Sequence, residues 1–552
     1  MQQCSPNEDF MKRHYLGNVK SNEASIDWFF GQYDETIRAF KNAHGYASHG
    51  LNSTSLDTLA AGYYCKDSRY YKNEKLLELM SNALSYIESH HRPNFTIDMM
   101  ESNFFCSPLF EAVNMSRAYR IMERYAKTEP EKTLLNRFTG YLPIIVKSLL
   151  NGGIHTPNHR WIGASGMLMM ANITGSSELR ELAQAYLDEG IDIDENGEFT
   201  ERSPHYNEVC DTSFMIIAME TGNMEYLEYA KKNMDLMFNY IEPNFTVFTQ
   251  NSNRQDKHEG DINAITPTYY LYYLYVHMSY LTKNAQYAKF ADDIYNSVEK
   301  AYGRGPGYLW MYMAYPELLE YEPEMEQYPT SFNIFHNDIV RFRNEDFSAT
   351  LITRSPNFLF VQKGDLRCFV RICASFFAVA QFKPLSIELV GKDKYQMKMR
   401  AHGEYYGPMP VKPASPKWKE MDHSLRPVNN EIDLEYTVTV QIKNDRVSLN
   451  VKTSECDNVP CKIEFCIGAP VDVKYDSVEF KGLPDECLSV NAKEIKMSKK
   501  DDCLTLTNSF SKHTYHKDMR GSIPPSKGAF TVYYTSFTHI DESIDIIGTK
   551  EA

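Results

Sequence analysis

Apolar residues recur at every third or fourth position over most of the first 320 residues. One clear example is the set Leu76, Met80, Ala83, Leu84 and Ile87. Similar segments lie near residues 108–127, 131–150, 158–173, 177–190, 207–221, 268–282 and 285–300. A spacing of three to four places the apolar residues of a segment on one face of a helix. The pattern therefore predicts an all-helical region from about Leu56 to Glu320.

Four of the predicted helices begin with Ser or Thr followed by Pro. The pairs are Ser107-Pro108, Thr156-Pro157, Ser203-Pro204 and Thr266-Pro267. A hydroxyl at the N-cap accepts a hydrogen bond from a backbone N–H of the first turn that has no partner within the helix. Pro suits the first helical position because the N–H that it lacks would have no partner there either. Successive pairs are separated by roughly 50 to 60 residues, which is enough for two helices and two loops. We therefore expect helical hairpins arranged as an α/α solenoid or a closed α/α toroid, with equivalent helix starts at one mouth.

The last 220 or so residues show strict alternation instead. The alternating apolar positions include Ile432, Leu434, Tyr436, Val438, Val440 and Ile442. Asn444-Asp445 then supplies a turn, after which the alternation resumes at Val447. A period of two is typical of antiparallel strands with one buried and one wet face. The predicted architecture is an α/α toroid over residues 1–325 followed by an antiparallel β-sandwich over residues 335–552.

Composition and charge narrow the possible partners. The chain has 552 residues, with 58 Lys and Arg against 73 Asp and Glu, for a net charge of −15. This balance argues against a nucleic-acid binder or a protein that adheres to anionic membranes. The sequence has no apolar run long enough to span a membrane. Its start shows no export signal, so we expect a cytoplasmic chain, or a periplasmic or secreted one if a signal was removed.

Cysteine usage does not point to a metal site. The eleven cysteines contain no CxxC pair, and the densest group is Cys456, Cys461 and Cys466 in a strand-like region. Buried free thiols explain this spacing better than zinc ligands do. We therefore predict no zinc site at these cysteines, and the chemistry considered below requires no metal and no organic cofactor.

Large polar side chains gather at two neighbouring helix starts. The second Ser/Thr-Pro start is followed by Asn158, His159, Arg160 and Trp161. The third start carries Glu201, Arg202, His205 and Tyr206. In a toroid of hairpins these first turns would converge on one rim, although a solvated capping network is the simpler explanation of either start alone.

Three weaker candidates belong to the same predicted site. Arg254 and Gln255 lie in a polar stretch that reads either as an exposed loop or as a loop over the rim. His336 stands where the β half begins and is either a packing residue or part of the site. Asn103 precedes the first Ser/Thr-Pro start and would occupy the rim of the preceding hairpin.

This set of residues suits β-elimination of a 4-linked uronic acid chain. The C5 proton is unreactive until the neighbouring carboxylate is neutralised or hydrogen-bonded. Asn158, Arg254 and the positive end of the helix that begins at Pro157 act in that direction. The same electrostatics favour neutral His159 and tyrosinate at Tyr206, so either residue can serve as the base.

On these residues the chain resembles the heparinase II/III-like polysaccharide lyases. The matching features are the Asn158-His159 pair that opens an inner helix, Tyr206 about one hairpin later, and His336 near the start of the β half. The resemblance implies an incomplete α/α toroid followed by a β-sandwich, and an anionic uronate polysaccharide as substrate. It also implies that Asn158 neutralises the carboxylate, that His159 and Tyr206 act as base and acid, and that His336 supports the site.

Two other functions fit parts of the pattern. A glycoside hydrolase on the same scaffold would need two facing carboxyl groups, and the candidates are Asp192, Asp194, Glu195, Glu198 and Glu201. A non-catalytic glycan-binding protein would use the polar rim only to hold sugar. Of these, the lyase explains the largest number of the gathered residues.

Overall fold

The computed structural model describes residues 10–93, 95–96, 107–258, 260–336 and 338–550. Asn103, one of the predicted site residues, lies outside this described part. The chain divides into two compact units. The first comprises Met1–Phe238, Ser252–Arg254 and Pro267–Tyr328, and the second comprises Asn239–Asn251, Gln255–Thr266 and Pro329–Ala552. Two segments that the sequence analysis assigned to the helical half, residues 239–251 and 255–266, thus belong to the second unit.

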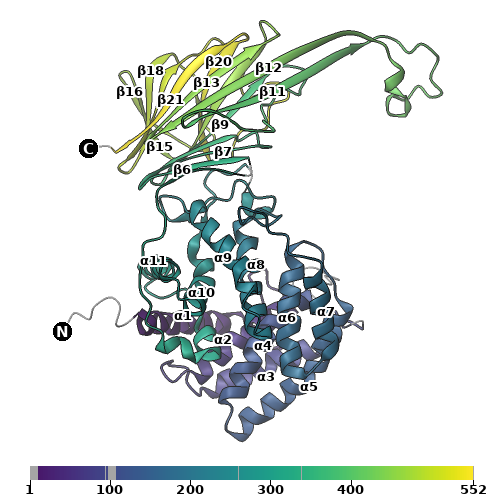
Figure 1. Cartoon of the computed structure of the whole chain (residues 1–552), viewed down its shortest axis with the longest axis vertical. Helices are drawn as coiled ribbons and strands as arrows, with labels where there is room; N and C mark the ends of the chain where they lie inside the picture. Colours follow the sequence, from purple (N-terminus) through teal and green to yellow (C-terminus); the bar gives the residue numbers. More distant parts are fainter. Residues whose placement is uncertain (1–9, 94, 97–106, 259, 337, 551–552) are drawn as a thin grey trace. The chain divides into compact units, whose positions relative to one another are not determined.

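The first unit is built from helical hairpins (Figure 1). Its helices are α1 (Phe10–Gln32), α2 (His49–Tyr64), α3 (Glu74–Ser89), α4 (Ser107–Tyr125), α5 (Glu129–Asn151), α6 (Asn158–Thr174), α7 (Ser177–Asp188), α8 (Pro204–Thr221), α9 (Tyr226–Met237), α10 (Tyr272–Thr282), α11 (Ala285–Tyr302) and α12 (Leu309–Ala314). Helices α2, α4, α6 and α8 pack against one another in that order, and each is followed by a partner that packs against it from outside. The predicted α/α toroid is confirmed.

Burial patterns explain which helices are inside. In α6 every residue from Trp161 to Ala171 is buried, whereas α7 buries only Leu179, Ala183 and Leu187. A helix that is apolar all round must be covered on all sides, and an amphipathic helix can cover it with one face. The alternation of the two kinds along the chain therefore produces an inner and an outer layer.

Two of the predicted helix starts differ from expectation. Ser203 is the N-cap of α8, and its hydroxyl accepts the amide of Tyr206, as predicted. At Thr266-Pro267 the helical start is displaced, because these residues form a short strand, Pro267 is the N-cap of the 3-10 helix Thr268–Leu271, and α10 follows from Tyr272. Proline fixes φ but not ψ, and Pro267 takes an extended ψ of 159°. The N-cap of α6 is Pro157 and not Thr156, whose hydroxyl accepts from the Asn158 side chain.

The second unit consists of two packed sheets. The nine-stranded sheet has the order β10-β11-β12-β13-β21-β19-β18-β15-β16, and the eight-stranded sheet has the order β17-β20-β14-β9-β8-β7-β6-β5. Their bounds are β5 (Phe332–His336), β6 (Ile339–Arg343), β7 (Phe347–Ile352), β8 (Leu359–Lys363), β9 (Leu366–Ala374), β10 (Glu388–Gly391), β11 (Lys394–Tyr406), β12 (Val428–Lys443), β13 (Arg446–Ser454), β14 (Pro460–Gly468), β15 (Val471–Tyr475), β16 (Val478–Gly482), β17 (Cys487–Leu488), β18 (Ala492–Lys499), β19 (Asp502–Ser509), β20 (Ala529–Phe537) and β21 (Asp541–Lys550). The pairing is antiparallel as predicted, except that β17 runs parallel to β20.

The alternation in the sequence matches the core of the sandwich. Leu434, Val438 and Val440 are fully buried between the sheets, and Lys443 pairs with Arg446 across the predicted two-residue turn. Ile432 departs from the pattern, because it is 37% exposed. This residue lies where β12 has β11 as its only neighbour, since β13 begins to pair with β12 at Glu435.

Candidate active site

Asn158 occupies the first turn of α6 and is completely buried. Its side-chain amide donates to Glu201 Oε2 at 2.7 Å and to the Thr156 hydroxyl at 3.1 Å. The side-chain oxygen of Asn158, Oδ1, is buried with no hydrogen-bond partner. An unsatisfied buried acceptor costs stability. The amide of Asn158 is thus aimed at a carboxylate, and its bonding is incomplete.

His159 follows directly and is only 5% exposed. Its Nδ1 accepts the backbone N–H of His155 at 3.1 Å, and its ring stands edge-on to Phe110. Burial lowers the pKa of His159 to about 4, with smaller contributions in the same direction from His155 and Arg254. The imidazole is therefore neutral at pH 7. Because Nδ1 accepts a hydrogen bond, the proton belongs on Nε2, which makes Nε2 a donor.

Glu201 and Arg254 connect the first turn of α6 with that of α8. The Glu201 carboxylate is 6% exposed and pairs with Arg254 Nε at 3.3 Å, without the alignment of a hydrogen bond. The backbone amide of Asn253 donates to the Glu201 carbonyl at 3.1 Å and fixes this segment over the helix start. One carboxylate thus lies between an amide donor and a guanidinium, which is an arrangement that recognises carboxylates.

Tyr206 stands in the first turn of α8 beside Arg254. The guanidinium carbon of Arg254 lies 4.7 Å from the centre of the Tyr206 ring, and the Tyr206 side chain is partly exposed. His205 is exposed and meets both Tyr206 and Tyr270 with its ring edge-on. The structure therefore brings Asn158, Glu201, Arg254 and Tyr206 together by direct contact, with His159 adjacent.

Arg160 and Trp161 do not join this group. Trp161 is completely buried, and its indole N–H donates to Asp192 at 3.0 Å. Arg160 pairs with the same carboxylate at 3.1 Å and lies over the Trp161 ring at 4.3 Å. Their contacts hold the α7–α8 connection against α6, and their role in substrate binding stays a prediction.

The remaining predicted residues have different positions. Arg202 is partly exposed and has a φ of 49°. Gln255 and His336 belong to the second unit and stay predictions. Two of the carboxylates that a hydrolase would need already have partners. Asp192 is bound by Trp161 and Arg160, and Asp194 accepts the backbone amides of Asn196 and Glu198 in a turn.

Sequence reasoning missed a second polar group in the first unit, in which Asp57 is buried and Glu208 and Arg117 are half-buried. Burial raises the pKa of Glu208 to about 7 and that of Asp57 to about 6, while Arg117 acts on both in the opposite direction. The Arg117 guanidinium lies 3.8 Å from the Trp310 ring. Glu208 follows Tyr206 by two positions on α8, which is the only signal in the sequence that associates it with the site.

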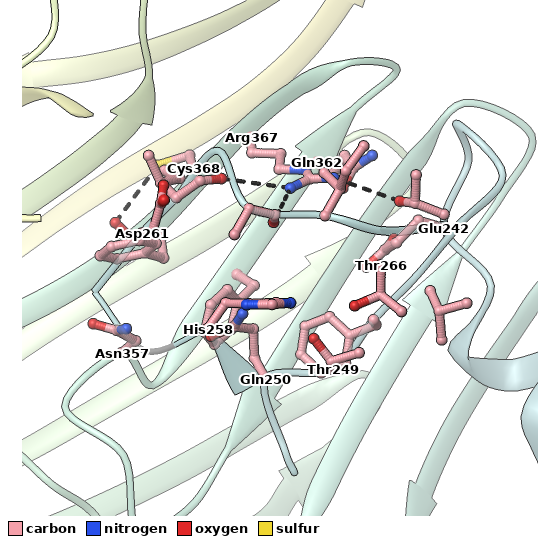
Figure 2. A pocket seen from close by; sticks show the side chains of 18 of the residues that line it. Glu242, Thr249, Gln250, His258, Asp261, Thr266, Asn357, Gln362, Arg367 and Cys368 are labelled. Atoms are coloured by element: carbon pink, nitrogen blue, oxygen red, sulfur yellow. Dashed lines mark hydrogen bonds between the residues drawn. The ribbon is translucent and has the colours of Figure 1, made fainter. Parts of the chain in front are cut away.

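The second unit contains a cavity of about 60 Å³ under the segment that joins α9 to α10 (Figure 2). Arg367 lines it and donates to the carbonyl oxygens of Ala264 at 2.9 Å and Ile262 at 3.4 Å. Glu242 and His258 also line it.

No family model matches the sequence, and no curated protein matches it either. Solved structures do match. A heparinase III (BT4657 gene product) is 12% identical with a TM-score of 0.53, and the match covers 91% of this chain and 77% of that one. A Paenibacillus xanthan lyase is 8% identical with a TM-score of 0.61, over 99% of this chain and 58% of that one.

A third match is the Streptomyces coelicolor A3 chondroitin AC lyase in complex with chondroitin sulphate. It is 10% identical with a TM-score of 0.54, over 99% of this chain and 83% of that one. The chain has the fold of these polysaccharide lyases. At such low identity the likeness concerns the toroid and the sandwich, and it assigns no residue. Among the helices of the described residues, none is long and apolar enough to cross a membrane.

Proposed function

We propose that this protein is a polysaccharide lyase that cleaves a 4-linked uronate glycan by metal-independent β-elimination. The observation that carries the proposal is the contact between Asn158, Glu201 and Arg254 next to Tyr206. Such a group binds a carboxylate and places a phenol beside it. The fold that this chain shares with polysaccharide lyases supports the same function, independently of the site residues.

Glu201 marks the position of the substrate carboxylate. In the structure, its carboxylate accepts from the Asn158 amide and faces the Arg254 guanidinium. A uronate that enters would have to take over these donors from Glu201. Hydrogen bonds to the carboxylate oxygens stabilise the enolate-like state that forms when C5 loses its proton.

Tyr206 and His159 then take separate roles. Tyr206, beside Arg254, acts as the base and removes the C5 proton. The electron pair of the C5–H bond forms the C4–C5 double bond, the C4–O4 bond breaks, and O4 takes up a proton, which Tyr206 can return. His159 is neutral with its proton on Nε2, so it is suited to donate to the substrate and not to act as base.

The proposal is tested by incubating the protein with a panel of uronate polysaccharides that includes chondroitin sulphate, heparan sulphate, xanthan and alginate. New ultraviolet absorbance from unsaturated ends is the expected result. New reducing ends without that absorbance would indicate a hydrolase and contradict the proposal. Bound polymer that stays intact would indicate a glycan-binding protein, and Tyr206→Phe provides the inactive control.

A further inference from the structure

The nine-stranded sheet of the second unit carries a two-stranded ribbon. Beyond Glu435, β12 pairs with β11 alone, so residues 401–406 and 428–434 form a pair with no further neighbour. Residues 407–427 join the two strands and are called the tip here. Figure 1 shows this ribbon running out past the other strands of the sandwich. An isolated two-stranded ribbon is marginally stable by itself. We therefore expect this ribbon to have a function.

The tip is a folded structure that presents a tryptophan. Trp418 is 64% exposed although its ring contacts His423 at 4.1 Å and the Arg426 guanidinium at 5.0 Å. His423 Nε2 bonds the Trp418 carbonyl at 2.7 Å, and Arg426 donates to the Gly407 carbonyl at 3.2 Å. These bonds fix the indole in place while most of its surface stays in water. A large exposed aromatic side chain held in this way marks an interaction site.

A groove lies at the base of the tip. It has a volume of about 470 Å³ and is lined by Phe377, Tyr405, Ile432 and Arg520 among others. Tyr405 is 59% exposed, and its ring lies 5.0 Å from that of Phe377. This volume falls within the ~300–1,000 Å³ range of small-molecule sites. Aromatic walls with one guanidinium suit a sugar that carries a carboxylate.

The two faces of the ribbon differ in charge. Tyr405 pairs with Asn430 and Gly403 with Ile432, so these residues share the face that lines the groove. The opposite face of the ribbon carries an acidic group, in which His402 bonds Asp433 and lies near Glu404. The groove face therefore receives no carboxylate from the paired strands of the ribbon.

The loops around the groove are basic on a chain with a net charge of −15. The tip has four basic residues, Lys412, Lys417, Lys419 and Arg426, against two acidic ones. The loop 511–527 has four basic residues against one acidic residue, and its Arg520 lines the groove. This local excess of positive charge attracts an anionic polymer that the rest of the protein would repel.

We propose that the groove and the tip form a second, non-catalytic binding surface for an anionic polysaccharide. Tyr405 and Trp418 lie against sugar rings, and Arg520 and the tip lysines pair with carboxylates. The identity of the polymer rests on the proposed function, because a uronate lyase needs such a substrate. The surface would keep a long chain attached between successive cleavages.

The test is electrophoresis of the full chain, in the Tyr206→Phe form, through gels cast with chondroitin sulphate or xanthan. We expect the gels to slow the protein, and Trp418→Ala and Tyr405→Ala each to lower the apparent association constant about tenfold. Trp418→Phe should retain most of the affinity. The matched control is Trp28→Ala, which removes a tryptophan that is 46% exposed in the first unit and should change nothing.

Equal retardation of the Trp418→Ala form and its parent would overturn the inference, and so would the absence of retardation by every polymer. A Trp418→Ala form that binds normally but changes from dimer to monomer in gel filtration would assign the surface to a second copy of the chain instead. Failure of the proposed function is seen separately, as the absence of unsaturated ends in an active-form assay. With Tyr206 present, Trp418→Ala should slow cleavage of the polymer but not of a tetrasaccharide.

Discussion

Two groups of buried polar side chains, one in each unit, are bonded in different ways. On the outer face of the eight-stranded sheet, Arg341 is fully buried and donates to the backbone carbonyl of Asn239 at 2.7 Å, in addition to its side-chain bonds to Glu242 and Thr350. Arg367 likewise donates to backbone carbonyls. At the start of α6, Asn158 donates to the side chains of Glu201 and Thr156 instead. Backbone partners cannot be exchanged for a ligand, whereas side-chain partners can. The comparison therefore separates groups that hold the fold from groups that can receive a substrate.

The largest effect expected from this comparison concerns Tyr206. The Tyr206→Phe change removes only the hydroxyl, since the helix cap at this position uses the backbone amide. Loss of a general acid–base group lowers the rate by about 10²–10⁴ fold. The release of unsaturated ends should fall at least this much, while the melting temperature stays unchanged. Full activity in this variant would show that the site has been assigned to the wrong residues.

A somewhat smaller loss is expected for Asn158→Ala. Removal of one donor to a developing negative charge costs about 10²–10³ fold in kcat. Because its proposed partner is the carboxylate, the loss should shrink when the substrate is a methyl ester, in which the charge is already neutralised. Rates on the free and esterified polymer check this prediction. An equal loss on both substrates would contradict the role given to Asn158.

Arg341→Met tests whether the buried polar side chains of the second unit hold the fold and take no part in the chemistry. The Arg341 guanidinium pairs with the buried Glu242 and donates to Thr350. Its removal leaves a buried carboxylate short of a partner, at a cost of about 3–5 kcal/mol in the free energy of unfolding. Denaturant unfolding should show this loss, while kcat per folded molecule should equal that of the unchanged protein. A fall in kcat without a loss of stability would mean that this face contributes to the chemistry.

The smallest expected effect is the pH dependence of stability that comes from His159. Its folded pKa of about 4 lies below the ordinary histidine value of 6.5. The unfolded chain therefore binds a proton first, and stability is lost as the pH falls from 6.5 towards 4. The contribution is about 3 kcal/mol at most. His159→Gln should flatten the difference between unfolding at pH 7 and at pH 4.5, and an unchanged slope would place His159 in a wetter environment than the structure does.

Much of the fold was predictable because periodicity reflects burial directly. The alternation at Leu434, Val438 and Val440 and the turn after Lys443 both correspond to the structure. The Ser203-Pro204 start was also recognisable, since Ser at the N-cap followed by Pro at the first helical position is a typical helix start. Thr266-Pro267 carried the same signal but the 3-10 helix there begins only at Thr268, because Pro is compatible with helical and extended ψ alike.

The residues of the candidate site could be predicted from the sequence, but the side chains that they contact could not. Two helix starts 40 to 50 residues apart gave Asn158, His159 and Tyr206, and the structure places their turns side by side through α6 and α8. The local sequence could not show that Trp161 points inward to Asp192, because the side on which a first-turn residue lies depends on the neighbouring hairpin. Glu201 was among the expected residues, yet its place between Asn158 and Arg254 is a tertiary feature.

The most direct test of the account is a binding measurement. Calorimetry on the Tyr206→Phe form can compare a uronate tetrasaccharide with its carboxyl-reduced analogue. If the α6 and α8 starts receive a carboxylate, the acid should bind about tenfold or more tightly than the analogue, at roughly 1.4 kcal/mol for each factor of ten. The preference should disappear when Asn158→Ala and Arg254→Ala are added. Equal affinity for the two sugars would contradict the account.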